Sequence, residues 1–470
     1  MPGTSKPPSS TKYSPRTVAL SILLTSQRHD RALDELLDQR VKSAPDSRDR
    51  ALIMELVYGV LRRQEILDWR LNALLTKPLP KLPAMVQMLL RIGAYQLLFL
   101  DRIPASAAVH ETVELTKASS QQLGRDWSAL VNAVLRNLIR LPRPTPPDLA
   151  ILPAEHLSIS YGIPLWLSKR WLARMGYAQA EVACQAASAI PSITLRVNRS
   201  RLTRDSLLEQ FIRAGVTAHP TGISPVGVTL DKGQEVSSLP GFETGDYYVE
   251  DEAAQLIPPI LDAQPGESIL DACAAPGGKA THLAELMGDR GTIVALDSKA
   301  SRLDLLRDNC RRLGLHSIVP IVGDARRPSD WPRELTGSRH AGLPLFDRIL
   351  VDAPCSGLGV MRRHPESKGQ RPESTFVRHQ VLQRQILESV ALCLRPGGVL
   401  VYSTCSTEME ETEEVITRFC KAYPGWMRES VAPWLPPAAL PFVTEQEALS
   451  TMCNRVGMDG FYAVRLRNMN

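Results

Sequence analysis

The sequence predicts a multidomain protein, with an all-α N-terminal bundle, a small α+β module and a C-terminal α/β domain built on a Rossmann-like, doubly wound sheet. Three observations support this fold class. A chain of 470 residues is too long for one ordinary domain. Apolar residues recur at helical spacing in the first 140 residues, and short apolar strands alternate with helices from Ser268 onward. We expect domain limits at 1–12, 13–140, 141–250 and 251–470, the first being a disordered tail.

The composition is that of a globular chain with a basic front. Apolar residues make up 44% and charged residues 22%, and no apolar run is long enough to span a bilayer. Residues 1–12 show no signal peptide, so we expect a cytoplasmic location. Residues 1–140 hold 20 Lys and Arg against 13 Asp and Glu, whereas the rest hold 35 against 37. This asymmetry indicates an anionic partner for the N-terminal third, or only a solvated helical surface.

The cysteines are scattered along the chain. No two have the C-x-x-C spacing of zinc sites, and the histidines do not cluster with them. We therefore expect free thiols, mostly structural with one or two catalytic, and no metal site. The eight cysteines are Cys184, Cys273, Cys310, Cys355, Cys393, Cys405, Cys420 and Cys453.

The N-terminal bundle is predicted from two strongly periodic segments, 52–61 and 86–98. Breaks fall at Pro45, at 78–83 and at 103–104, so several small helices joined by short loops are expected.

Two stretches of this bundle, from Pro104 to Leu115 and from Val131 to Arg136, resemble the antitermination factor NusB. The resemblance implies a NusB-like helical RNA-binding domain over 13–140, which suits the positive charge of this region. A purely structural role for its arginines is equally open. The candidates for RNA contact are Arg28, Arg31, Arg48 and Arg50.

The middle of the chain begins with a linker over 141–147 that four prolines stiffen. A helix over 164–189, a strand over 192–198, a helix over 204–214 and short strands up to Val249 then form the α+β module.

The C-terminal domain is predicted from its strand–helix rhythm. Strands are expected at 268–273, 291–297, 317–323, 347–352 and 398–403. Helices are expected at 280–287, 299–313, 376–393 and 409–422. The Pro-rich stretch 422–441 reads as an irregular loop, and 459–467 as a closing strand.

The ends of the first three strands suggest a ligand site. The first strand runs into a loop of small residues that a ligand can approach closely, Cys273, Ala274, Ala275, Pro276, Gly277 and Gly278. Asp297 ends the second strand, 20 residues after Gly277, where an acid can bind ribose hydroxyls. Asp324 follows the third strand and can accept from an adenine amino group. Each aspartate alone is more often a cap or turn residue, but together they indicate an adenosine ligand without phosphates, such as S-adenosylmethionine.

The ends of the last two strands carry thiols. Asp352 ends the fourth strand, with Cys355 three residues later, and Cys405 ends the fifth strand before a helix start. A helix N-terminus lowers the pKa of a nearby thiol, and ligands of open α/β sheets bind at this edge. The fourth and fifth strands are expected to be neighbours, so both thiols can face one cleft. The alternative is that Cys405 is only a small buried hydrophobe.

Three motifs together, Ala274 to Lys279, Asp352 to Gly357 and Tyr402 to Ser406, resemble the RNA cytosine-5 methyltransferases. With the NusB-like front, nearly the whole chain resembles the bacterial Sun/Fmu type of this family. It departs from the family at Glu250, where Gln is usual, at Ala254, where Ser is usual, and at Ala280, where Thr is common. These departures put local contacts in doubt.

The resemblance implies a class I S-adenosylmethionine-dependent methyltransferase fold and methylation of carbon 5 of a cytosine in 16S ribosomal RNA, expected to be cytosine 967, through a covalent cysteine–cytosine adduct. It assigns the nucleophile to Cys405 and adduct release to Cys355. Asp352 is expected to support nitrogen 3 and to contact the cofactor, and Lys279 to hold Asp352 or the cofactor. Arg302 is also expected at the cofactor site. A monomer without metal or membrane partners is expected.

Three alternatives stay open. The order Pro354-Cys355 matches the attacking motif of DNA cytosine methyltransferases, which would exchange the roles of the two thiols. An RNA-binding regulatory protein with a vestigial catalytic domain would bind S-adenosylmethionine without turnover. The same enzyme acting on transfer RNA or on another ribosomal site is the third.

Overall fold

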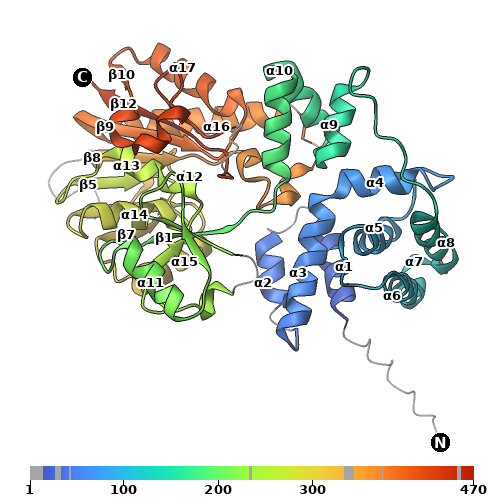
Figure 1. Ribbon diagram of the computed structural model, residues 1–470. Helices are drawn as coiled ribbons and strands as arrows, with labels where there is room; N and C mark the ends of the chain where they lie inside the picture. Colours follow the sequence, from blue (N-terminus) through green and yellow to red (C-terminus); the bar gives the residue numbers. More distant parts are fainter. Residues whose placement is uncertain are drawn as a thin grey trace, which may run out of the picture. The chain divides into compact units, whose positions relative to one another are not determined.

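The computed structural model describes residues 14–26, 33–41, 44–231, 235–332, 343–369, 371–372, 374–452 and 457–470 (Figure 1). The predicted tail 1–12, the candidate RNA contacts Arg28 and Arg31, and Cys453 lie outside these residues. The chain divides into two compact units. One unit contains residues 1–188 and 364–370, and the other contains residues 189–363 and 371–470. Our four domain limits remain a prediction.

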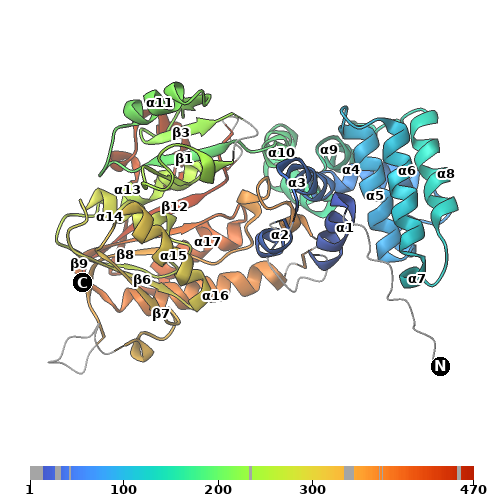
Figure 2. The same cartoon turned by 90° about the horizontal axis from the view of Figure 1, so that it is seen from below.

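The helical unit confirms the all-α prediction. Its described helices are α1 (Pro15–Ser26), α2 (Leu33–Val41), α3 (Ser47–Arg62), α4 (Gln64–Asn72), α5 (Ala84–Phe99), α6 (Ala105–Ala118), α7 (Ser120–Leu123), α8 (Ser128–Arg140), α9 (Pro153–Tyr161) and α10 (Leu165–Ser188), with short 3-10 helices η1 (Leu79–Lys81) and η6 (Pro365–Lys368). Helix α5, the most apolar of them, packs against α1, α6 and α8 and fills the centre (Figure 2). The predicted breaks coincide with helix ends. At Asp46, for example, the side chain caps α3 by accepting from Asp49 N.

The second unit begins with a small antiparallel sheet of order β2-β3-β1-β4. Its elements are β1 (Ile193–Val197), α11 (Arg204–Arg213), β2 (Ala218–Pro220), β3 (Gly227–Leu230), η2 (Val236–Ser238) and β4 (Tyr247–Val249). Arg196 of β1 is fully buried and forms ion pairs with Glu250 at 2.7 Å and with Glu285 at 2.8 Å. Glu285 lies on helix α14 (Gly278–Leu286) of the main domain, so a buried charge cluster attaches this module to the rest of its unit.

The main sheet has the order β10-β12-β9-β8-β5-β6-β7, with β11 pairing with β12. Strands β9, β8, β5, β6 and β7 run parallel, and β12 and β10 run antiparallel beside β9. The strands are β5 (Ser268–Asp271), β6 (Thr292–Asp297), β7 (Ile318–Val322), β8 (Phe346–Asp352), β9 (Leu394–Thr404), β10 (Trp426–Glu429), β11 (Leu449–Ser450) and β12 (Tyr462–Asn468). The doubly wound prediction is therefore confirmed, with an antiparallel edge added to it.

Helices cover both faces of this sheet. They are α12 (Glu252–Gln255), α13 (Ile257–Leu261), α14 (Gly278–Leu286), α15 (Ala300–Leu313), α16 (Ser374–Ala391) and α17 (Glu413–Ala422). Ile269 packs into the apolar cluster of α13, α14 and α15, whereas the next residue, Leu270, packs into the cluster of α16 and α17. This alternation is what the period of a strand requires, and Figure 2 shows α14 and α15 on one face and α16 on the other.

Three details differ from the expectation. The stretch 422–441 is not wholly irregular, because Trp426–Glu429 forms β10 at the sheet edge between flanking prolines. The helix expected from residue 409 begins only at Glu413, because Thr412 has φ −122° and ψ −105°, outside the helical region. Strand β9 begins earlier than expected, at Leu394, and its pairing with β8 shifts register between Phe346 and Arg348.

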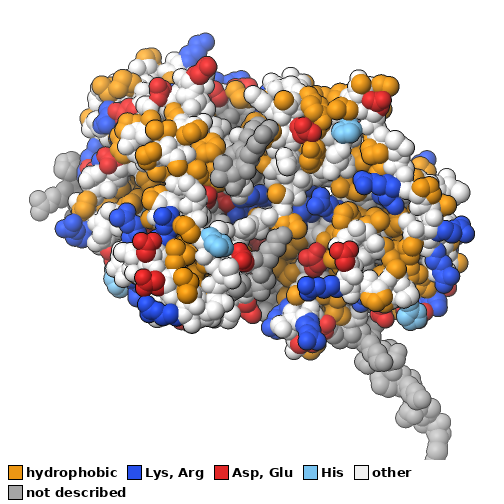
Figure 3. All heavy atoms as spheres, in the orientation of Figure 1, with side chains coloured by type: hydrophobic (Ala, Val, Ile, Leu, Met, Phe, Trp, Pro, Cys, Tyr) orange, Lys and Arg blue, Asp and Glu red, His pale blue; other side chains and the backbone are white. Residues whose placement is uncertain are grey.

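Short 3-10 helices complete the described elements of the second unit: η3 (Pro328–Asp330), η5 (Leu358–Val360), η7 (Met409–Glu411), η8 (Ala432–Trp434) and η9 (Pro437–Phe442). Within the described ranges, no helix is both long and apolar enough to cross a membrane. On the face seen in Figure 3, Lys and Arg side chains gather along the edge of the helical unit that carries α6 and α8. Arg136 and Arg140 of α8 are exposed.

Candidate active site

The predicted site residues lie at one edge of the main sheet. Parallel neighbours β6, β5, β8 and β9 end at Asp297, Asp271, Asp352 and Thr404. Since the carboxyl ends of parallel strands meet at the same edge, the loops that follow them share one site.

The loop after β5 fits close approach by a ligand. Gly277 has φ 112° and caps α14, and a Cβ added to it would lie 2.3 Å from Leu306 Cδ1. A Cβ on Gly278 would lie 2.7 Å from Glu250 Oε1. The positive φ favours glycine at position 277, whereas a side chain at position 278 would require Glu250 to move; the bare backbone leaves the N-terminus of α14 accessible to a ligand.

Asp297 and Arg302 join this loop. Ala275 N donates to Asp297 Oδ2 at 3.3 Å, and Lys299 N donates to Asp297 Oδ1 at 2.9 Å. Arg302 donates to the Ala275 carbonyl and lies 3.4 Å from Asp297 Oδ2. The structure thus brings together the predicted loop, the acid after β6 and the predicted arginine.

Asp324 lies at the next strand end but already has a partner. Arg326 donates to both of its carboxylate oxygens, with Nε 3.0 Å from Oδ1 and Nη2 2.7 Å from Oδ2. This hydrogen bonding holds the pKa of Asp324 below its ordinary value. The sequence reasoning did not identify this pair, and a ligand that uses Asp324 must share the carboxylate with Arg326.

Asp271 was missed. It is 1% exposed, and neither carboxylate oxygen has a hydrogen-bond partner among the described residues. Burial, and then the neighbouring charge of Asp352, raise the pKa of Asp271 to about 7. A signal was present in the sequence, because this carboxylate stands at the end of the first strand directly before the glycine loop.

Asp352 and Lys279 form an ion pair at the centre of the edge. Lys279 Nζ donates to Asp352 Oδ2 at 2.7 Å, and Ser403 Oγ donates to Asp352 Oδ1 at 2.7 Å. Burial alone would lower the pKa of Lys279, but the charge of Asp352 outweighs burial and raises it. The Nζ atom also lies 4.9 Å from the ring centroid of Phe461.

The two thiols meet. Cys355 Sγ lies 3.2 Å from Cys405 Sγ, and both side chains are partly exposed. The hydrogen bond with Cys405 and burial raise the pKa of the Cys355 thiol well above its ordinary value, so Cys355 keeps its proton at neutral pH. Cys405 packs against the apolar core on one side and contacts the second thiol on the other. Cys273, by contrast, lies on the β5 loop, where burial raises the pKa of its thiol.

The loops behind the thiols pack tightly. Gly359 N donates to the Cys405 carbonyl at 2.9 Å, and Gly460 N donates to the Gly359 carbonyl at 2.8 Å. A Cβ on Gly359 would lie 1.9 Å from the Gly460 carbonyl oxygen, so glycine is required at this crossing. Within the described parts of the chain, no group of three or more His, Cys, Asp or Glu residues is placed to hold a metal ion.

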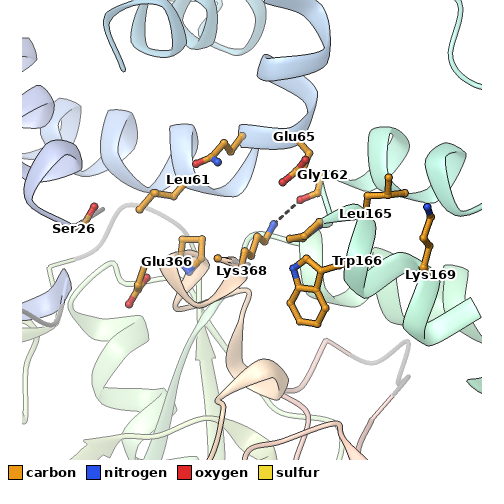
Figure 4. A pocket seen from close by; sticks show the side chains of 13 residues that line it. Ser26, Leu61, Glu65, Gly162, Leu165, Trp166, Lys169, Glu366 and Lys368 are labelled. Atoms are coloured by element: carbon orange, nitrogen blue, oxygen red, sulfur yellow. Dashed lines mark hydrogen bonds between the residues drawn. The ribbon is translucent and has the colours of Figure 1, made fainter. Parts of the chain in front are cut away.

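A separate cavity of about 810 Å³ lies in the helical unit, and its lining includes no predicted site residue (Figure 4). Lys368 points into it and donates to the Gly162 carbonyl at 2.9 Å and to the Arg62 carbonyl at 3.0 Å. Burial, with the charges of Arg62 and Arg63, lowers the pKa of Lys368 to about 7. This lysine therefore anchors the segment 364–370 within the helical unit.

Comparison with known protein families matches three regions of the chain. Residues 258–467 match the family described as 16S rRNA methyltransferase RsmB/F, and residues 13–140 match the NusB family. Residues 163–237 match the ferredoxin-like domain of RsmF/B-like methyltransferases.

Individual relatives extend over most of the chain. A probable ribosomal RNA small subunit methyltransferase B of Bacillus subtilis (strain 168) is 35% identical over 458 residues, covering 97% of this chain and 99% of the relative. Ribosomal RNA small subunit methyltransferase B of Pseudomonas syringae pv. tomato is 38% identical over 423 residues, 89% of each chain.

Two solved structures share the fold. The crystal structure of PH0851 has a TM-score of 0.78 at 24% identity and covers 97% of this chain and 99% of its own. A methyltransferase homolog protein from Pyrococcus horikoshii has a TM-score of 0.56 at 27% identity, covering 68% of this chain and 99% of its own. On the strength of its full-length relatives, this chain belongs to the RsmB-type family of 16S rRNA methyltransferases with an N-terminal NusB domain.

Proposed function

We propose that this enzyme methylates carbon 5 of a cytosine in 16S rRNA, expected to be cytosine 967, with S-adenosylmethionine as methyl donor and a covalent adduct between Cys405 and the base. Family membership supports the RNA substrate. The observation that carries the cytosine-5 chemistry is the 3.2 Å separation of the Cys355 and Cys405 sulfur atoms beside the Asp352–Lys279 pair. Attack at carbon 6 and release of the adduct need two groups at one place, which this arrangement supplies.

The residues at the ends of β5, β6 and β7 fit S-adenosylmethionine. Asp271 has two buried carboxylate oxygens without partners among the described residues, and the glycine loop excludes side chains from its surface. Asp271 would accept from the amino group of the donor, Asp297 from its ribose hydroxyls and Asp324 from its adenine. When bound, the donor supplies an electrophilic methyl group on a sulfonium.

Cys405 attacks carbon 6 as the thiolate. An Sγ–C6 bond forms, the C5–C6 π electrons move onto the ring, and carbon 5 becomes nucleophilic. Negative charge develops at nitrogen 3 and is neutralised by a proton that passes from the ammonium group of Lys279 through the Asp352 carboxylate, whose Oδ2 lies 2.7 Å from Lys279 Nζ.

Cys355 completes the cycle. After methylation, carbon 5 carries both a hydrogen and the new methyl group. Cys355 takes the proton from carbon 5 while its own proton passes to the Cys405 sulfur. The C5–H electrons restore the C5–C6 double bond, the Sγ–C6 electrons return to sulfur, and nitrogen 3 gives its proton back through Asp352 to Lys279. The raised pKa of Cys355 suits this role, because its thiolate is a strong base once its proton has left.

The exchanged assignment, with Cys355 as nucleophile, is the second candidate. The Pro354-Cys355 order favours it. The raised pKa of Cys355 opposes it, because an attacking cysteine must populate its thiolate.

The test is the Cys355→Ala variant, expressed in cells and analysed on a denaturing gel. We expect a protein–RNA adduct that survives denaturation, since release is blocked, with the link at Cys405 by peptide mapping. Cys355→Ala combined with Cys405→Ala is the matched control and should give no adduct. Sequencing the trapped RNA locates the target nucleotide.

Three results would change the proposal. A link at any residue other than Cys405 would overturn the nucleophile assignment. Absence of an adduct, with an active wild-type enzyme, would remove Cys355 as the release group. Absence of 5-methylcytosine in RNA treated with the wild-type enzyme would reject cytosine-5 chemistry altogether.

A further inference from the structure

We propose that Glu411 is a positioning residue that sets the separation of the two thiols by holding the residue that follows each of them. The catalytic consequence rests on the function proposed above, whereas the positioning itself does not. Glu411 belongs to η7 (Met409–Glu411), is 0% exposed and touches neither sulfur in any described hydrogen bond.

One carboxylate binds both thiol loops. Ser356 N donates to Glu411 Oε1 at 2.8 Å, and Ser356 Oγ donates to Oε2 at 2.5 Å. Ser406 Oγ donates to the same Oε2 atom. Ser356 follows Cys355 and Ser406 follows Cys405, so a shift of this carboxylate moves both thiols.

The sheet itself does not fix Cys355. The ladder between β8 and β9 ends where Asp352 pairs with Ser403, and Ala353 N donates to the Ser403 carbonyl at 2.8 Å just beyond it. Cys405 is therefore two residues past the last ladder pair, but Cys355 is three residues past it in a loop. That loop needs another anchor, and the Ser356–Glu411 contacts supply one directly beside the thiol.

Helix α16 supports this arrangement from behind. His379 Nδ1 lies 2.8 Å from Glu411 Oε1, and Gln383 Nε2 donates to the Pro354 carbonyl at 3.0 Å. These two residues are one helical turn apart, so one face of α16 contacts both the carboxylate and the residue before Cys355. Tyr402 of β9 also donates to the Glu411 carbonyl at 2.8 Å.

The ionised state of Glu411 suits the three hydrogen bonds that its carboxylate accepts from Ser356 N, Ser356 Oγ and Ser406 Oγ. Burial alone would raise the pKa of Glu411, but the close contact with His379 and the hydrogen bonds from Ser356 and Ser406 outweigh it and hold the pKa below its ordinary value. The ionised carboxylate accepts all of these bonds and has no hydrogen to donate. Alanine here would leave two hydroxyl groups and one N–H without this acceptor, whereas glutamine keeps the shape and one acceptor oxygen.

The first experiment measures thiol proximity without any methylation. Diamide takes two electrons and two protons from a thiol pair and leaves a disulfide and the hydrazine. In the full-length protein without RNA or cofactor, the rate of Cys355–Cys405 disulfide formation is followed by peptide mapping. We expect Glu411→Ala to slow it by about tenfold or more and Glu411→Gln by about threefold or less, because misplacement by about 1 Å can cost two orders of magnitude.

Glu388→Ala is the matched control, because it removes a carboxylate of α16 whose described partner is Arg384. It should leave the rate unchanged. If Glu411→Ala does not fold, Ser356→Ala and Ser406→Ala each remove one hydroxyl from the carboxylate and should each slow the disulfide by about twofold to fivefold. Wild-type rates in Glu411→Ala, or in both serine variants, would overturn the proposal.

The second experiment separates this proposal from the function on which it rests. In single-turnover methylation, Glu411→Ala should lower the rate constant by about tenfold or more and leave the affinity for S-adenosylmethionine unchanged, with recovery in Glu411→Gln. If the wild-type enzyme makes no 5-methylcytosine but Glu411→Ala slows the disulfide, the proposed function fails and the positioning role stands. Equal loss of rate and cofactor affinity would assign Glu411 a general structural role instead.

Discussion

The edge of the main sheet that carries the site has two halves, which are held in different ways. The cofactor half consists of the loops after β5, β6 and β7, where we propose that S-adenosylmethionine binds, and the thiol half consists of the loops after β8 and β9. At the cofactor half, each hydrogen-bond acceptor and its donor are 2 to 27 residues apart in sequence; the acceptors are Asp297, the Ala275 carbonyl and Asp324. At the thiol half, Asp352 and Ser356 are held by partners 51 to 73 residues away. The cofactor half is thus held by partners no more than 27 residues apart, whereas Asp352 and Ser356 depend on segments more than 50 residues away; at the thiol half, the contact of Ser406 with Glu411 spans only five residues.

The largest test of this contrast concerns Lys279, which starts from the cofactor loop and reaches Asp352. Lys279→Met should lower the single-turnover methylation rate by about 10³-fold, because Asp352 loses its cation and its proton source. The affinity for S-adenosylmethionine, measured by calorimetry, should fall by only about tenfold. Lys421→Met, an exposed lysine of α17, is the control. A rate within threefold of wild type would show that the contact of Lys279 with Asp352 is not needed for methyl transfer.

An intermediate effect is expected at Asp271, in the cofactor half. Its pKa is about 7 in the folded protein against an ordinary 3.8, so between these values the folded state binds a proton that the unfolded chain has lost. Stability therefore falls as pH rises from about 4 through 7, and Asp271→Asn should remove this loss. Above pH 7 the variant should be more stable than wild type by roughly 2–4 kcal/mol, and near pH 4 the two should agree.

Urea denaturation midpoints at several pH values measure this difference. Asp304→Asn, which removes an exposed carboxylate of α15, should leave the pH dependence as in wild type. The stabilised Asp271→Asn protein should bind S-adenosylmethionine about tenfold more weakly, because one of two buried acceptor oxygens is replaced by a donor NH2 group. If Asp271→Asn and the wild-type protein are equally stable at every pH, the pKa of Asp271 is not raised and Asp271 is ionised in the folded protein at neutral pH.

The smallest effect concerns RNA affinity and lies outside both halves, in the helical unit. Arg136 and Arg140 of α8 are exposed one turn apart, with asparagine side chains as their described hydrogen-bond acceptors. Replacing both with alanine should weaken RNA binding by about tenfold and reduce the slope of log affinity against log salt by about 2. Arg307→Ala with Arg311→Ala, a pair of equal spacing on α15, is the control. An unchanged salt slope would remove α8 from the RNA-binding surface.

Local patterns predicted much of the fold and of the site. Apolar runs that end in a polar residue located β6, β8 and β9, and with them Asp297, Asp352 and Cys405. The pairing of β8 with β9 also followed from strand order. Glu411 could not be found in this way, because its function depends on Ser356, 55 residues earlier, and no periodicity connects them. Strand β10 was not predicted, because a strand of four residues between prolines is too short to show a clear alternation of apolar and polar residues.

The segment 364–370 has a consequence for biosynthesis. Residues 1–188 leave the ribosome long before this segment, yet its Lys368 donates to the carbonyls of Arg62 and Gly162 inside the helical unit. The nascent helical unit therefore lacks the Lys368 donor until most of the methyltransferase sequence has been translated. A gene fragment that stops after the helices encodes an incomplete unit, and an exchange of N-terminal domains between relatives must carry both pieces.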